Sequence, residues 1–159
     1  MNFKKGDRVV HKNFGVGIVV LIEGVNFSGN GPHLFYRVDF NRTTVWVPVG
    51  NRSEGGLRPI TPKNHLDQYR ALLKSPPVLL DDDFRKRHSE LEKRMARGTF
   101  QGLCEVIRDL NALSAVKPLN YYERTLFKQS REALVSEWSV TSGLSQSETM
   151  GEIDRCLKH

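Results

Sequence analysis

The hydrophobic period changes near residue 60, and this change restricts the fold more than any other feature of the sequence. Up to about Ile60, short runs rich in valine, isoleucine and aromatic residues alternate with turns, as in β-strands. From Thr61 onward, apolar residues recur every three or four positions, as on one face of an α-helix. The sequence therefore predicts an α+β protein of several parts, with strands first and helices after them.

Four or five short strands are expected in residues 1–60. The strand-like runs are DRVVHK, VGIVVLIEGV, LFYRVDF, TVWVPV and GGLRPI, and a turn with Asn30-Gly31 separates the second from the third. Strands this short and this numerous predict a small, strongly bent sheet or barrel of the SH3 or Tudor kind. Gly15 and Gly17 are expected to permit a tight bend between two of the strands.

A connecting helix and linker are expected over residues 61–80, followed by an all-α bundle of about four helices over residues 81–159. Thr61 and Pro62 have the residue types of a helix start, and Pro76-Pro77 marks a boundary. The expected caps inside the bundle are the run Asp81–Asp83, the pair Asn120 and Glu123, and the pair Ser145 and Glu148.

Composition and motifs argue against several classes of protein. The chain has 159 residues, of which 38% are hydrophobic, so a folded protein is expected. Its longest apolar run, VGIVVLI, is too short to span a bilayer, and the N-terminus lacks the features of an export signal. Cys104 and Cys156 are expected to be buried free thiols, and the histidines lack metal-ligand spacing. We find no catalytic constellation, so we expect no enzyme activity, no cofactor and no metal site.

Positive charge is concentrated in one stretch, which suggests an anionic partner. The net charge is +6, and residues 84–97 hold six bases and two acids. Phe84 stands directly before three of these bases, yet it shares a helical stripe with Leu91 and Met95, which favours the core. A basic helix end with a protruding aromatic ring favours DNA binding instead, with the ring as a wedge in the minor groove. The residues alone leave both interpretations open.

Trp46 is the second candidate binding residue. In the stretch TTVWVPV, Val45 and Val47 share one face of a strand and Trp46 lies on the other. If the valines face the interior, Trp46 either anchors another protein or is covered by the connecting helix. The sequence favours neither alternative.

The order of these features resembles the CarD family of bacterial transcription regulators over nearly the whole chain. The similar stretches are FKKGDRVVHKNFGVGIV and VWVPV in the first part, and FRKRHSELEKRMARG, EVIRDL and YYERTLFKQSREALVSE in the second. The resemblance implies a Tudor-like domain that binds the β subunit of RNA polymerase by β-augmentation. It also implies a helical domain that wedges a tryptophan into promoter DNA near the −10 element and stabilises the open promoter complex.

Carried over by position, the resemblance assigns residues to both contacts. The wedge tryptophan falls on Phe84, and phenylalanine is a residue type that wedges use. Arg87 and Lys128 match family bases, and the other cations are added from their charge. The expected DNA-binding residues are Phe84, Arg85, Lys86, Arg87, Arg124, Lys128 and Arg131. The expected polymerase-binding residues are Val25, Asn26, Phe27, Val45, Trp46 and Val47.

We therefore expect a monomeric, cytoplasmic, nucleoid-associated regulator. Its expected partners are the polymerase β subunit and promoter DNA, and no contact with a membrane is expected. The main alternative is an adaptor on the polymerase whose helical domain binds protein rather than DNA. A sequence-specific helix-turn-helix repressor is a weaker alternative, because no helix pair with a short glycine turn precedes a polar recognition helix.

Overall fold

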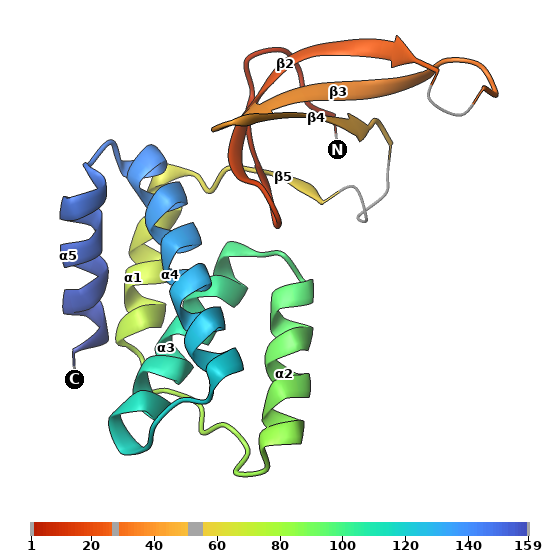
Figure 1. Ribbon diagram of the computed structural model, residues 1–159. Helices are drawn as coiled ribbons and strands as arrows, with labels where there is room; N and C mark the ends of the chain where they lie inside the picture. Colours follow the sequence, from red (N-terminus) through yellow and green to blue (C-terminus); the bar gives the residue numbers. More distant parts are fainter. Residues whose placement is uncertain (1, 27–28, 51–55, 159) are drawn as a thin grey trace. The chain divides into compact units, whose positions relative to one another are not determined.

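The computed structural model describes residues 2–26, 29–50 and 56–158, and its contacts divide the chain into two compact units (Figure 1). Met1–Ile60 form the sheet unit, and Thr61–His159 form the helical unit. The predicted fold class, a small antiparallel sheet followed by a helical part, is confirmed.

The sheet unit is one antiparallel sheet with the strand order β4-β3-β2-β1-β5. A shift in register between Val19 and Leu21 marks a β-bulge, which bends β2. In this order β4 lies at one edge of the sheet, beside β3 only. The strands are β1 Arg8–His11, β2 Gly15–Val25, β3 His33–Phe40, β4 Thr43–Pro48 and β5 Leu57–Pro59.

One face of the sheet carries the core of the sheet unit. Alternate residues of the strands point to this face, as the pleat requires. Gly17 allows close packing there, because a Cβ atom at this position would lie 2.7 Å from the ring of Phe40. Gly15, with a φ of 82°, permits the predicted bend between β1 and β2. The buried apolar residues are Val9, Val19, Tyr36, Val38, Phe40 and Val47.

The helical unit contains five α-helices in its described residues, preceded by the short 3-10 helix η2 at Lys63–His65. The first α-helix packs against α3 and α5 through Leu66 and Leu73. It is therefore a full member of the helical unit, beside the four helices that were expected over residues 81–159. The helices are α1 Leu66–Lys74, α2 Phe84–Ala96, α3 Phe100–Val116, α4 Tyr121–Ser142 and α5 Gln146–Leu157.

Two apolar clusters hold the helical unit together. The larger cluster surrounds Trp138 and joins α1, α3, α4 and α5, and it contains Cys104 and Cys156 as buried free thiols, as predicted. The smaller cluster joins α2, α3 and α4 around Leu91, with Met95 packed against it. Among the helices that the structure describes, none has both the length and the apolar character to cross a membrane.

The predicted helix caps are largely confirmed. Asp83 caps α2, and complete capping boxes begin α4 at Asn120 and α5 at Ser145. The prediction for Thr61 is wrong. Its N–H and its hydroxyl donate to the carboxylate of Glu137, at 3.0 and 2.7 Å, so Thr61 satisfies a buried acid rather than a helix end.

Candidate functional site

Phe84 is the first residue of α2 and lies outside the apolar clusters. The carboxylate of Asp83 accepts a hydrogen bond from the Arg85 N–H at 2.9 Å and fixes the start of the helix. The Phe84 side chain is 59% exposed, and the guanidinium of Arg85 lies 5.6 Å from the centre of its ring. The core alternative for Phe84 is therefore wrong. An exposed ring beside a cation is the arrangement that the wedge interpretation requires.

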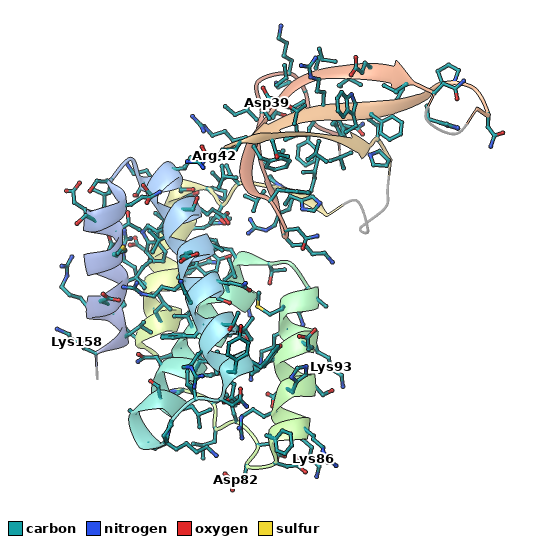
Figure 2. The ribbon with its side chains drawn as sticks, in the orientation of Figure 1. Asp39, Arg42, Asp82, Lys86, Lys93 and Lys158 are labelled. Carbon is teal, nitrogen blue, oxygen red and sulfur yellow. The ribbon has the colours of Figure 1, made fainter. Side chains whose placement is uncertain are left out.

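Arg85 and Lys86 are exposed at the same end of α2. Lys86 projects on the side of α2 that faces away from the other helices (Figure 2). Neither side chain is held by an ion pair within the described part of the helical unit. Both cations are therefore available to a partner from outside the chain.

Arg87 departs from the expectation of a free phosphate-binding cation. Its guanidinium is buried and forms an ion pair with Glu123 in the first turn of α4. It also donates to the carbonyl oxygens of Asp81 and Asp82, at 2.9 and 3.2 Å. Glu123 in turn accepts the N–H of Asn120 at 3.0 Å within the capping box. Arg87 thus positions the starts of α2 and α4 and has no exposed surface with which to hold a phosphate.

The three predicted cations of α4 form a separate group. Arg124, Lys128 and Arg131 are spaced by four and three residues, so they share one stripe of the helix. Arg131 donates to both carboxylate oxygens of Asp154 in α5, each at 2.9 Å, and Arg124 donates to the Leu119 carbonyl at 2.7 Å. Lys128 is exposed. This stripe therefore lies on the side of α4 that meets α5.

The predicted DNA-binding residues are consequently not all brought together. The side of α4 that meets α2 carries Tyr122 and Glu123, which contact His88 and Arg87. The side that carries Arg131 meets α5 instead. The structure therefore gathers Phe84, Arg85 and Lys86 at the start of α2, and it places the α4 stripe on another side of the helical unit.

Sequence reasoning missed an aromatic contact one turn after Phe84. The ring of His88 stacks on Tyr122 with 3.9 Å between ring centres, and the Tyr122 hydroxyl donates to Glu92 at 2.5 Å. Burial and the neighbouring Glu92 raise the pKa of Tyr122, so the phenol remains a donor. The only signal in the sequence is the spacing of His88 and Glu92 by four residues. These contacts join the middle of α2 to the first turn of α4.

A buried ion network at the other end of α2 was also missed. Arg94 donates to Asp109 of α3 and to Glu90, each at 2.6 Å. Asp109 also accepts from Arg108 at 2.8 Å and from the backbone N–H of Val78 at 2.9 Å. Because Asp109 contacts all of these groups, it ties residues 75–83, here called the strap, to α3. Arg94 is therefore another base of the cluster that is directed inward.

In the sheet unit, the described members of the predicted polymerase-binding set lie on the edge strand β4 and at the end of β2. Val47 is buried in the core and Val45 packs against it. Trp46 lies on the opposite face, 39% exposed, and donates to the carboxylate of Glu23 at 2.5 Å. Val25 ends β2 and Asn26 is exposed beyond it, whereas Phe27 lies outside the described residues. Trp46 and Asn26 are thus the described members of the set that are exposed, and Trp46 is the aromatic one.

The described side chains offer no alternative site with metal chemistry. Within residues 2–26, 29–50 and 56–158, no group of three or more histidine, cysteine, aspartate or glutamate side chains could hold a metal ion. Among the described residues of the two predicted binding sets, the exposed aromatic rings are Trp46 on the edge strand and Phe84 at the start of α2.

Comparison with known proteins assigns both units. Residues 3–61 match the family described as the CarD-like/TRCF RID domain, and residues 69–154 match the family described as CarD, C-terminal domain. The chain belongs to the CarD family. A relative from Bacillus subtilis (strain 168), named "Putative transcription factor YdeB", is 24% identical over 147 residues, which cover 92% of this chain and 96% of that protein. The two family matches meet near the border between the sheet unit and the helical unit. Transcription regulation is therefore the function of the family, and its RID domains interact with RNA polymerase.

Proposed function

We propose that this protein binds the β subunit of RNA polymerase through its sheet unit and stabilises the open promoter complex through its helical unit. It acts in the cytoplasm at the nucleoid, as a monomer. The contact with DNA is made near the −10 element, at the upstream edge of the melted region, without a preference for base sequence. Phe84 is the wedge at the fork in this proposal.

The edge position of β4 supports the polymerase contact. A strand at a sheet edge presents backbone N–H and C=O groups with which a strand of another protein can pair. Val45 and Val47 face the core and hold β4 in place, while Trp46 offers an aromatic anchor on the outer face. β-augmentation uses the backbone of such a strand, so the burial of Val47 does not prevent it.

The exposure of Phe84 is the observation that carries the DNA contact. Single exposed apolar residues are common on protein surfaces, but Phe84, which is 59% exposed, has the guanidinium of Arg85 5.6 Å from its ring centre. An exposed ring beside free cations supports a contact with DNA. The start of α2 is rigid, because Asp83 caps it and Arg87 joins it to Glu123. A wedge residue benefits from a rigid helix end, because a mobile ring would lose conformational entropy when it inserts into the DNA.

The effect on the promoter follows from a difference in affinity. Docking on the polymerase raises the local concentration of DNA to roughly millimolar, so weak phosphate contacts become effective. Phe84 stabilises an unstacked junction and gains little from a closed duplex. Only this difference shifts the equilibrium between the closed and open complexes. A difference of about 1.4 kcal/mol would raise the population of open complex tenfold.

The lifetime of the open complex tests this proposal. We would measure it on one promoter without the protein, with the native protein, and with the Phe84→Ala variant. Met150→Ala is the control, because Met150 is an exposed apolar residue of α5. We expect the native protein and the control to lengthen the lifetime and Phe84→Ala to lose most of this effect. Equal lifetimes with Phe84→Ala and with the native protein would refute the wedge.

One observation favours the adaptor as a second candidate function. Leu79 of the strap is 93% exposed, although Val78 and Leu80 on either side of it are held by Asp109 and by the smaller apolar cluster. A fully exposed leucine on an anchored segment fits a contact with protein. Fluorescence anisotropy with forked promoter DNA separates the two functions. The adaptor predicts no salt-dependent binding of this DNA, whereas the DNA-binding function requires it.

A further inference from the structure

The exposed cations of α2 share one face of the helix. At about 100° per residue, corresponding to 3.6 residues per turn, the four cations that remain outside the ion network fall within an arc of about 120°. All four are exposed, and no acid lies in the arc, which the structure describes in full. The arc contains, in chain order, Arg85, Lys86, Ser89, Lys93, Ala96 and Arg97.

The remaining charges of α2 leave this face with an excess of cations. Arg87 and Arg94 point inward to Glu123 and Asp109, so they lie on the opposite side of the helix. Glu90 is paired with Arg94, and Glu92 accepts the hydrogen bond from Tyr122. Both acids border the arc, within about 20° of Arg85 and Arg97, and their described partners lie outside it. Four cations against two acids leave the outer face with a net positive charge.

The helix dipole does not explain the arrangement. A cation near the C-terminal end of a helix is stabilised by the dipole, which would account for Lys93 and Arg97. Arg85 and Lys86 lie in the first turn, where the same dipole disfavours cations. The dipole therefore accounts for the second half of the row and not for the first.

The length of the row suits a duplex. Arg85 and Arg97 are twelve residues apart, so at a rise of about 1.5 Å per residue the row is about 18 Å long. This length corresponds to about 5 base pairs of B-form DNA, at about 3.4 Å per base pair. Lys86 and Lys93 project from the same side of α2, away from the other helices (Figure 2).

We propose that Arg85, Lys86, Lys93 and Arg97 bind the phosphates of double-stranded DNA along the whole outer face of α2. The inference rests on the proposed function and adds the path of the duplex to it. The duplex lies along α2, and the fork lies at the N-terminal end of the helix, where Phe84 extends past the first turn. Lys93 and Arg97 are new members of the interface, remote from the wedge.

Salt-dependent DNA binding by the full-length chain tests the path. The variant is Lys93→Gln/Arg97→Gln, and the ligands are two DNAs labelled with a fluorophore, one forked and one without a duplex arm. One DNA has an upstream duplex arm of about 12 base pairs, which is longer than the row, and the other has a single-stranded arm of equal length. The control is Lys63→Gln/Lys74→Gln, which removes the same charge and also takes a lysine from the last turn of a helix.

We expect the variant to lose affinity for the DNA with the duplex arm only. Each phosphate contact contributes about 0.9 to the slope of log affinity against log salt, so the slope should become shallower by about 1.8. If the variant and the native protein bind equally at 1 M salt, this change in slope lowers the affinity of the variant by up to about 60-fold at 0.1 M salt. The control should bind both DNAs like the native protein, and thermal unfolding should show that both variants are folded.

Three results would overturn the inference, and they distinguish it from the proposed function. If Lys93→Gln/Arg97→Gln binds normally while Phe84→Ala and Arg85→Gln/Lys86→Gln bind weakly, the duplex does not follow α2 and the proposed function stands. If none of these variants binds weakly, the proposed function fails as well. If Lys63→Gln/Lys74→Gln loses as much affinity as Lys93→Gln/Arg97→Gln, the effect reflects total charge and not this face.

Discussion

Replacing Arg87 by alanine should destabilise the helical unit rather than only weaken DNA binding. The side chains of Arg87 and Glu123 are 6% and 2% exposed, so the ion pair is shielded from water. Removal of the guanidinium leaves the Glu123 carboxylate buried without its charged partner, which typically costs about 3–5 kcal/mol. The carbonyl oxygens of Asp81 and Asp82 lose their donor in the same variant. A domain of this size has a free energy of unfolding of roughly 5–15 kcal/mol, so the loss is a large part of it.

Urea unfolding followed by circular dichroism measures this loss. Arg85→Ala is the matched control, because the neighbouring arginine is exposed and its removal should change the free energy of unfolding by less than about 0.5 kcal/mol. The double variant Arg87→Met/Glu123→Gln removes both charges, and glutamine still fits the capping box at this position. We expect this double variant to recover most of the stability that Arg87→Ala loses, because no uncompensated charge remains buried.

The reasoning is refuted if Arg87→Ala and Arg85→Ala have the same free energy of unfolding. Arg87 would then be a surface cation in solution, and a direct phosphate contact would again be its simplest role. A double variant that is less stable than Arg87→Ala would also contradict the account, since it would show that burial of the unpaired carboxylate is not the source of the loss.

Two further predictions concern the edge strand and α5. Trp46→Ala should weaken binding to a purified polymerase β-subunit fragment by about tenfold or more, whereas Thr44→Ala on the same face of β4 should not, and equal affinities in a pull-down titration would exclude Trp46 as an anchor. Hydrogen bonds with the backbone and hydroxyl of Ser145 hold the pKa of Glu148 below its usual value. The capping box of α5 therefore contributes stability above about pH 4.3, the usual pKa of glutamate. This contribution is lost as the pH falls through the lower pKa of Glu148 in the folded state. Urea unfolding between neutral and acid pH should therefore show a smaller loss of stability for Glu148→Gln than for the native protein, and parallel losses would contradict this.

Local signals in the sequence were sufficient for the secondary structure. The alternation of Tyr36, Val38 and Phe40 predicted β3, and all three residues are buried in the sheet unit. Asn120 with Glu123 predicted the start of α4, because a capping box involves only residues within one turn. Interactions of this kind depend on neighbours in the chain, so a single sequence contains the information needed to predict them.

Contacts between distant residues could not be predicted in the same way. Thr61 has the residue type of a cap, but its partner Glu137 lies 76 residues away in α4. Arg87 has the appearance of one base in an exposed cluster, and its partner Glu123 lies 36 residues away. The sequence does not say which acids will be buried beside these residues, and a buried acid outweighs a local preference because its desolvation is costly.

The orientation of α2 shows how one such error changes the functional surface. The apolar stripe that begins at Phe84 predicted the buried side, yet the buried line of the helix runs through Arg87, Leu91 and Arg94. A hydrophobicity pattern assigns arginines to the surface. Here two arginines are buried because they form ion pairs with Glu123 of α4 and Asp109 of α3. Phe84 lies on the same side of α2 as Leu91 and Met95, and it is exposed because it is the first residue of the helix. The other cations of the cluster then form the single outer face on which we place the duplex.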